Sequence, residues 1–315
     1  MLAPSALPQQ SSPSPPDIRI SVDRVDVGVV VTDSTGQFIE GLRREDFRLF
    51  DDGAEQPITD FLSIDAPAQV LVLIEAGPAV YLIEAGHLRA LNALLNGLSP
   101  NDRVAIARYN EAPEPILNFT ADKLAAAATL GQLRFNLGFG QLNLASSLGT
   151  ALDWLAQVPG KKSLVLLSTG IDTSPPAAAQ NLLARLKSTD VRVLAISLGG
   201  ELRGSAAPDK KRPKKDQPTP EKMRATAEGF AQADEELKSI ACANGGRVYF
   251  PTSTKDFAAV FAEIAQLVRH EYSLGFVPPA HDGELHTIDI RITGPAPAAD
   301  LSYRVDHRPA YVAPQ

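Results

Sequence analysis

The stretch that decides the fold is VLVLIEAGPAV, residues 70–80. Its apolar run, 70–74, lacks the polar alternation of a half-buried strand and predicts a central parallel strand that is covered on both faces. Glu75, Gly77 and Pro78 follow as a loop, and a helical pattern comes next. In open α/β sheets, ligands bind beyond the carboxyl ends of such strands, where the strand order reverses. We therefore expect this loop to lie at the functional site.

Strand and helix patterns alternate along the rest of the central segment. Such alternation predicts βαβ units, and hence an α/β fold with a doubly wound, mostly parallel sheet and helices on both faces. The expected further strands are 103–110, 114–120 at an edge, 163–168, 191–198 and 247–250, and the expected helices include 121–133, 144–157, 177–188, 233–244 and 256–268.

Both ends of the chain show the two-residue period of strands that bury one face. Apolar residues alternate along 25–31 and again along 288–292. Each end offers only a small β unit, too little to form a stable domain by itself. We therefore predict that residues 17–66 and 270–313 complete one small antiparallel β-sandwich, into which an α/β domain, residues 67–269, is inserted.

Two segments fit neither unit. Residues 1–16 are rich in proline and serine and predict a disordered leader. They suggest a secreted or periplasmic protein whose signal peptide this sequence lacks. Residues 201–224 are proline-rich and basic, a composition that cannot bury enough surface to fold. We expect a solvated surface loop there, with an electrostatic contact to an anionic partner as the alternative.

Composition narrows the possible partners. A net charge of −7 and an isoelectric point near 5.3 argue against nucleic acid, because phosphate binding needs a basic surface. No apolar run approaches the roughly 18–20 residues of a membrane span. The single cysteine, Cys242, excludes an intrachain disulfide framework. It lies on an apolar helix face, so we expect a buried structural thiol.

A set of sequence phrases carries a family resemblance. Residues 68–268 resemble a von Willebrand factor A-type domain. Four flanking phrases make nearly the whole chain similar to the VWFA-related proteins that are abundant in acidobacterial genomes. The phrases are VVVTDSTGQFIEGLRREDFRLFDDGAEQPITDF at 29–61, GGRVYFPTS at 245–253, EYSLGFVPP at 271–279 and YRVDHRPAYVAP at 303–314. Each phrase is weak alone, and the set in this order is specific.

The resemblance implies a six-stranded sheet with strand order 3-2-1-4-5-6 and a metal-ion-dependent adhesion site (MIDAS) at its carboxyl edge. Such a site has a D-x-S-x-S loop after the first strand, a threonine in a later loop and an aspartate after the fourth strand. These carboxylates and hydroxyls hold Mg²⁺, while an open position accepts an acidic residue from a partner.

This sequence departs from the implied site in its first two loops. Glu75, Gly77 and Ala79 stand where D-x-S-x-S has an aspartate and two serines. Leu142 stands at the threonine position, or Gln141 if the alignment shifts by one residue. Both hydroxyls of the first loop are therefore absent, and the remaining carboxylate is longer by one methylene.

The third loop departs as well. Thr169 stands where the family has the second carboxylate. Glu75 and Asp172 remain nearby, but Mg²⁺ requires near-octahedral coordination by several oxygen atoms. The sequence therefore predicts a degenerate, metal-free MIDAS and no cofactor, with Mg²⁺ held by these two carboxylates as the alternative.

These features predict a non-catalytic interaction or adhesion module that binds a protein partner at the carboxyl edge of the sheet. Loops on a rigid scaffold often serve recognition even without a metal. The open alternatives are metal-dependent adhesion through Glu75 and Asp172, and a structural spacer or homo-oligomer subunit. The residues that mark the expected binding face are Glu75, Gly77, Ala79, Leu142, Asn143, Thr169 and Asp172.

An enzyme is not expected. The sequence lacks G-x-G-x-x-G after a strand, G-x-x-x-x-G-K-[ST] and G-x-S-x-G, which excludes the common dinucleotide, P-loop and hydrolase motifs. His281 and His286, with Asp282 and Glu284 between them, are the only close histidine group. Their position between strands is typical of a solvated turn, because a zinc site needs three or four convergent ligands.

Overall fold

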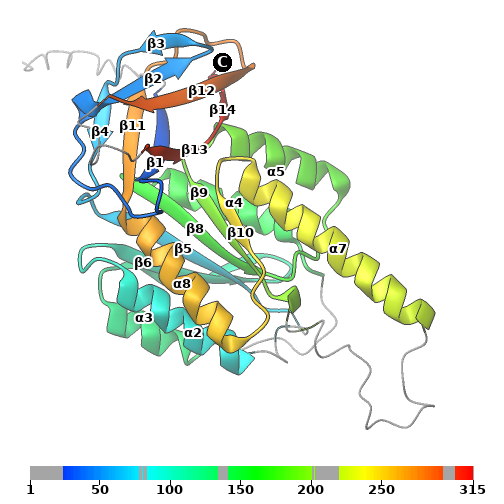
Figure 1. The fold of residues 1–315 in the computed structure, drawn as a ribbon. Coiled ribbons are helices and arrows are strands. Elements are labelled where there is room, and N and C mark those ends of the chain that lie inside the picture. Colours follow the sequence, from blue (N-terminus) through cyan, green and yellow to red (C-terminus); the bar gives the residue numbers. More distant parts are fainter. Residues whose placement is uncertain are drawn as a thin grey trace, which may run out of the picture.

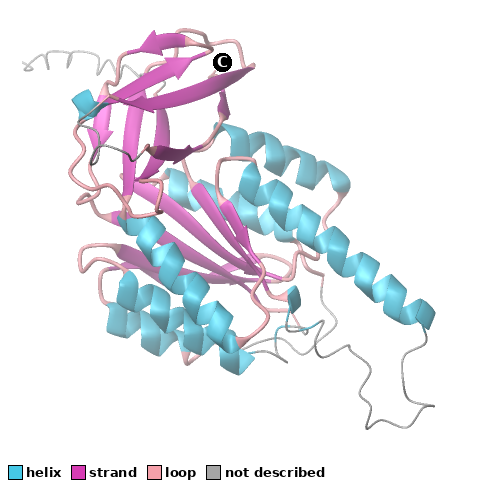
Figure 2. Ribbon diagram, viewed as in Figure 1, coloured by secondary structure: helices cyan, strands magenta, loops and turns pink. Residues whose placement is uncertain are grey.

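In the computed structural model, the chain forms one six-stranded sheet and two four-stranded sheets (Figures 1 and 2). The predicted leader, 1–16, and most of the predicted basic loop, 201–224, lie outside the residues that the structure describes. Those residues are 24–77, 80, 84–133, 141–200, 202, 220–293 and 302–314.

The six-stranded sheet has the order β10-β9-β8-β5-β6-β7. Only β7 runs antiparallel to its neighbour, and it lies at the edge. When β5 is counted as the first strand of this sheet, the order is 3-2-1-4-5-6, as predicted. All residues of β5 are buried. The strands are β5 (Ala68–Glu75), β6 (Arg103–Tyr109), β7 (Pro113–Thr120), β8 (Lys161–Ser168), β9 (Arg192–Ser197) and β10 (Arg247–Tyr249).

Helices cover both faces of this sheet (Figure 2). Alternate residues of β5 enter the two cores, with Val70 and Val72 on one side and Leu71 and Leu73 on the other. The first core is covered by α2 (Glu84–Gly97), α3 (Lys123–Leu130) and α8 (Thr254–Arg269). The second is covered by α4 (Leu144–Ala156), α5 (Pro176–Ser188) and α7 (Pro220–Cys242). None of the described helices is long and apolar enough to cross a membrane.

Helix α7 corrects two expectations. It begins at Pro220, so residues 220–224 are helical and do not belong to a loop. Proline suits the first turn of a helix, where its missing N–H has no intrahelical partner. Cys242 is exposed, whereas we expected it to be buried. The buried stripe of α7 contains Leu237 and Ala241, and one further residue along the helix turns about 100° away from that stripe.

The two ends of the chain form the antiparallel β-sheets that were predicted there, and these are two sheets of four strands each. Their orders are β13-β1-β11-β4 and β14-β12-β2-β3. Valines 27 and 29 from one sheet share a core with Phe47, Leu49 and Ile290 from the other, so the sheets form a β-sandwich. The strands are β1 (Val25–Thr32), β2 (Phe47–Asp51), β3 (Ala54–Gln56), β4 (Asp60–Leu62), β11 (Glu271–Phe276), β12 (Leu285–Ile292), β13 (Arg304–His307) and β14 (Ala310–Val312), with a 3₁₀ turn at Arg44–Asp46.

A lysine clamp joins the sandwich to the six-stranded sheet. Lys161, the first residue of β8, is buried, and its Nζ donates to the carbonyl oxygens of Ile64 at 3.0 Å and Glu271 at 3.1 Å. Ile64 precedes β5 and Glu271 follows α8, so one side chain holds both connections between the two parts of the chain. Burial lowers the pKa of Lys161, although the nearby Glu271 carboxylate opposes that shift.

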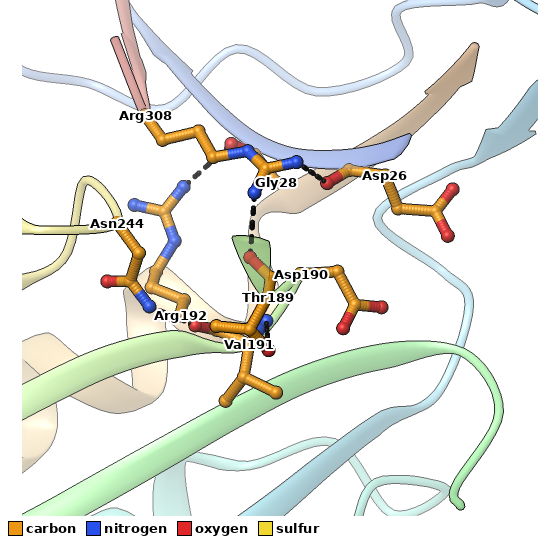
Figure 3. A pocket seen from close by; sticks show the side chains of 8 residues that line it. All are labelled: Asp26, Gly28, Thr189, Asp190, Val191, Arg192, Asn244 and Arg308. Atoms are coloured by element: carbon orange, nitrogen blue, oxygen red, sulfur yellow. Dashed lines mark hydrogen bonds between the residues drawn. The ribbon is translucent and has the colours of Figure 1, made fainter. Parts of the chain in front are cut away.

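Two buried arginines complete the junction (Figure 3). Arg192 forms an ion pair with Glu271, and both side chains are 5% exposed. Arg308 reaches from the sandwich and donates to the carbonyl oxygens of Thr189 at 2.7 Å and Asp26 at 2.8 Å. Burial lowers the pKa of Arg308 to about 10. The two arginines line a cavity of about 10 Å³, which has room for a single water molecule.

The junction determines which edge of the sheet is free. Lys161 and Arg192 are the first residues of β8 and β9, so the sandwich lies against the amino ends of these strands. Their carboxyl ends point away from the sandwich (Figure 1). The loops expected to carry function therefore lie at the edge of the sheet far from the sandwich.

Replacing Glu271 by alanine is expected to lower the free energy of unfolding by about 3–5 kcal/mol, because Arg192 would keep a buried charge without its partner. The double variant Arg192→Met, Glu271→Leu is expected to recover much of that loss, since no buried charge then remains at the pair. Urea unfolding followed by circular dichroism measures both effects. A loss below about 1 kcal/mol for the single variant, the size typical of an exposed pair, would contradict this account.

Candidate functional site

The carboxyl edge of the sheet is built around the side chain of Glu75, the last residue of β5. This carboxylate is fully buried. It accepts hydrogen bonds from the Thr169 N–H at 2.7 Å and the Thr169 hydroxyl at 2.8 Å. Hydroxyls of Ser168 at 3.1 Å and Tyr109 at 3.3 Å add two more donors. All four of these donors lie on Oε2, and the Thr169 hydroxyl also lies 3.0 Å from Oε1. Protein donors therefore surround the group that the sequence resemblance aligns with the first metal-ligating aspartate.

The same network joins three neighbouring strands. The hydroxyls of Tyr109 on β6 and Ser168 on β8 lie 2.7 Å apart, and the Ser168 oxygen also accepts the Gly170 N–H at 2.9 Å. Burial raises the pKa of the Glu75 carboxyl, while its hydrogen bonds with Thr169 and the other donors oppose that shift. Burial and the adjacent Glu75 also raise the pKa of Tyr109.

Leu142 closes the space above Glu75. Its side chain is 8% exposed. A Cβ atom added at Gly77 would lie 3.0 Å from the Leu142 Cδ2 and 3.4 Å from the Glu75 Oε1, so the leucine packs directly against the backbone beside the carboxylate. The position that the sequence resemblance aligns with a metal-ligating threonine thus holds an apolar side chain. Ala79 lies outside the described residues.

The Asp172 carboxylate, which the sequence offered as a possible metal ligand, binds backbone N–H groups instead. It accepts the N–H groups of Leu144 and Ala145, both at 3.1 Å, and that of Ser174 at 2.8 Å. It therefore caps the amino end of α4, where Asn143 makes no capping bond through its own side chain. No hydrogen-bond donor is shared between Asp172 and Glu75.

The loops at this edge are fastened to each other by further hydrogen bonds. Thr173 donates through its N–H to the Leu142 carbonyl at 2.7 Å, and its hydroxyl accepts the Leu142 N–H at 2.9 Å. The Asn143 side chain donates to the Glu111 carbonyl at 2.9 Å. The loops after β6 and β8 and the one before α4 thus form one connected surface.

The strand order 3-2-1-4-5-6, the antiparallel edge strand and the loops that meet beyond β5 and β8 identify the architecture. The α/β domain has the von Willebrand factor A-type fold. The structure confirms this part of the sequence resemblance. The further likeness to acidobacterial proteins stays a prediction.

Comparisons with known proteins found similarity to solved structures alone. No family model and no curated protein matches the sequence. A solved structure of BatB from Bacteroides thetaiotaomicron is 15% identical, with a TM-score of 0.45 over 64% of this chain and 99% of that one. A von Willebrand factor type A protein from Catenulispora acidiphila is 12% identical, with a TM-score of 0.47 over 95% of this chain and 76% of that one.

A second group of polar side chains lies on the sandwich. Asp51, Asp52 and His286 place potential metal-ligating atoms within 4.8 Å of one another. The two aspartates lie far from His286 in the sequence. His281, which lies five residues before His286, does not belong to this group of ligating atoms. In the sequence, His281 and His286 indicated only a solvated turn.

Replacing Glu75 by alanine is expected to lower the free energy of unfolding by about 2–4 kcal/mol, because the buried Thr169 N–H and three hydroxyls lose their acceptor and a cavity forms. Glu75→Gln is expected to stay within about 1 kcal/mol of the wild type, since its amide fits the same space and the hydroxyls can reorient to accept. Urea unfolding tests both. Equal losses in the two variants would show that the charge, and not the hydrogen-bonding shape, is required.

The pH dependence of stability provides an independent test. Folding raises the pKa of Glu75 above its ordinary value of 4.5, so the folded state holds this proton more tightly than the unfolded state. The stability that this group contributes is fully present below pH 4.5 and is lost as the pH rises through the folded pKa. The Glu75→Gln variant should therefore gain stability relative to the wild type as the pH rises above 4.5. A difference that does not change with pH would contradict the raised pKa.

Proposed function

We propose that this chain is a non-catalytic protein-binding module whose contact surface is the carboxyl edge of the A-type sheet and needs no metal ion there. The observation that supports the proposal is that protein groups already surround the Glu75 carboxylate: Thr169 donates to it through its N–H and its hydroxyl, and the buried Leu142 lies beside it at Gly77. A cation at Glu75 would have to displace these donors and the leucine.

The proposed surface presents one large apolar side chain among polar neighbours. Ile171 is 41% exposed, and its N–H donates to the Thr169 hydroxyl at 3.3 Å. Gln141 and Thr173 beside it are also exposed. Because the loops are already fastened to each other, little conformational entropy would be lost on binding, and an apolar anchor in a polar rim is typical of protein interfaces.

The two alternative functions make different demands on the structure. Metal-dependent adhesion would need Glu75 and Asp172 to exchange their present donors for one shared ion. Homo-oligomer formation finds support in Leu285 and Val277, which are 54% and 38% exposed on the described part of the sandwich. An extracytoplasmic location stays a prediction from the composition of residues 1–16.

A binding comparison tests the proposal. Partners retained from extracts of the source cells are expected to be lost with Ile171→Asp and retained with Leu124→Asp. Leu124 is 83% exposed at the start of α3, beyond the opposite edge of the sheet, and so provides a matched control. Retention should not change when a chelator replaces millimolar Mg²⁺. Binding that survives Ile171→Asp, or that requires Mg²⁺, would contradict the proposal.

A further inference from the structure

We propose that the β-sandwich holds a divalent transition-metal ion, with Asp51, Asp52 and His286 as its ligands. The site lies away from the carboxyl edge of the A-type sheet. It is independent of the protein-binding function proposed above, because no residue is shared between them.

Pairing of two strands brings the three residues together. Asp51 ends β2 and pairs with Ile288 of β12, while Asp52 begins the following hairpin turn. His286 lies two residues before Ile288 on β12. Its Nδ1 is 2.9 Å from the Asp52 Oδ2 and 3.6 Å from the Asp51 Oδ1. These separations are close to those between neighbouring ligand atoms around an ion with bonds of about 2.0–2.2 Å.

Each carboxylate is held from outside the cluster through one oxygen atom, and its other oxygen faces His286. Asp51 accepts the Tyr311 hydroxyl at 3.0 Å through Oδ2, while its Oδ1 faces His286. Asp52 accepts the N–H and the hydroxyl of Thr287, both at 2.8 Å, through Oδ1, while its Oδ2 faces His286. The other oxygen atoms of both residues are therefore directed at the same imidazole nitrogen, with the Asp52 Oδ2 at hydrogen-bond distance from it and the Asp51 Oδ1 unpartnered.

The imidazole is oriented in the same way. The His286 Nε2 lies 3.2 Å from the Asp282 Oδ1, and Asp282 itself accepts the Glu284 N–H at 2.9 Å. A carboxylate on the far nitrogen of a histidine is the usual support of a metal ligand, because it fixes the ring and raises its basicity. Nδ1 is thereby presented to the two aspartates.

The decisive observation is an unpartnered buried oxygen atom. The Asp51 side chain is 1% exposed, and its Oδ1 accepts no hydrogen bond. Buried carboxylate oxygens normally have donors. Burial raises the pKa of Asp51, whereas the Tyr311 hydroxyl and the charge of His286 act in the opposite direction. Three carboxylates, with Asp282, surround one imidazole, so a divalent cation would neutralise the excess negative charge.

The donor set indicates the class of ion. One imidazole nitrogen and two carboxylate oxygens suit Zn²⁺ and its first-row neighbours better than Mg²⁺ or Ca²⁺, which prefer oxygen ligands alone. Three protein ligands leave a position for water, and the 53% exposed Asp52 side chain gives access from solvent. The ion would tie the β2–β3 turn to β12 and, through Tyr311, to β14.

Zn²⁺ added to the chelator-stripped, untagged full chain is expected to bind with one-to-one stoichiometry in calorimetry and to raise the melting temperature. Asp52→Asn and His286→Asn should each weaken the affinity at least tenfold. Asp282→Asn should weaken it about 10- to 100-fold, as for other supporting carboxylates. Co²⁺ should give a visible absorption band in the wild type that is lost in His286→Asn.

Two matched variants control for unspecific binding. His281→Gln removes a neighbouring histidine, and Asp289→Asn removes an exposed carboxylate on the same strand. Both are expected to bind Zn²⁺ as the wild type does, and circular dichroism verifies that every variant is folded. Absence of heat and of a thermal shift at millimolar Zn²⁺ would overturn the proposal. Unchanged affinity in folded Asp52→Asn and His286→Asn would overturn it as well.

Discussion

The structure depends on the pairing of β11 with both β1 and β4. β4 leads into the six-stranded sheet and β11 leaves it, and they pair side by side through Leu62 and Ser273. β1 pairs with β11 on its other side, so segments more than 240 residues apart meet in one ladder. This closure allows the A-type fold to stand as an insertion in the sandwich. Lys161 holds both connecting segments at once and so fixes how the insertion is oriented.

That orientation exposes the carboxyl edge of the sheet, where hydrogen bonds within the protein hold the Glu75 carboxylate. The Glu75 carboxylate accepts hydrogen bonds from residues on or next to the two flanking strands. These bonds link the strand ends, as a bound cation would link the loops. Asp172 meanwhile caps a helix. Hydrogen bonds and one packed leucine can therefore hold the loops in place without an ion. The side chains around Ile171 are then the groups that can contact a partner.

Glu75 and Asp51 are both buried carboxylates, and they differ in their partners. Every oxygen of Glu75 accepts a hydrogen bond, whereas one oxygen of Asp51 accepts none and faces an imidazole. The energetic cost of burying a charge depends on what surrounds it. We therefore interpret the Glu75 carboxylate as a structural group and the Asp51 carboxylate as part of an incomplete coordination sphere. Residue type alone does not distinguish these two cases.

The sequence determined the fold. Period-two and helical patterns predicted the antiparallel sheets of the chain ends and the doubly wound sheet, because buried faces impose those periods locally. It also placed Glu75 and Thr169 at the correct edge. Tertiary structure alone decided that Leu142 covers Glu75, that Asp172 caps α4, that Cys242 faces outward and that His286 meets Asp52. His286 and Asp52 lie on strands more than 230 residues apart in sequence, and local periodicity carries no information about which distant side chains converge.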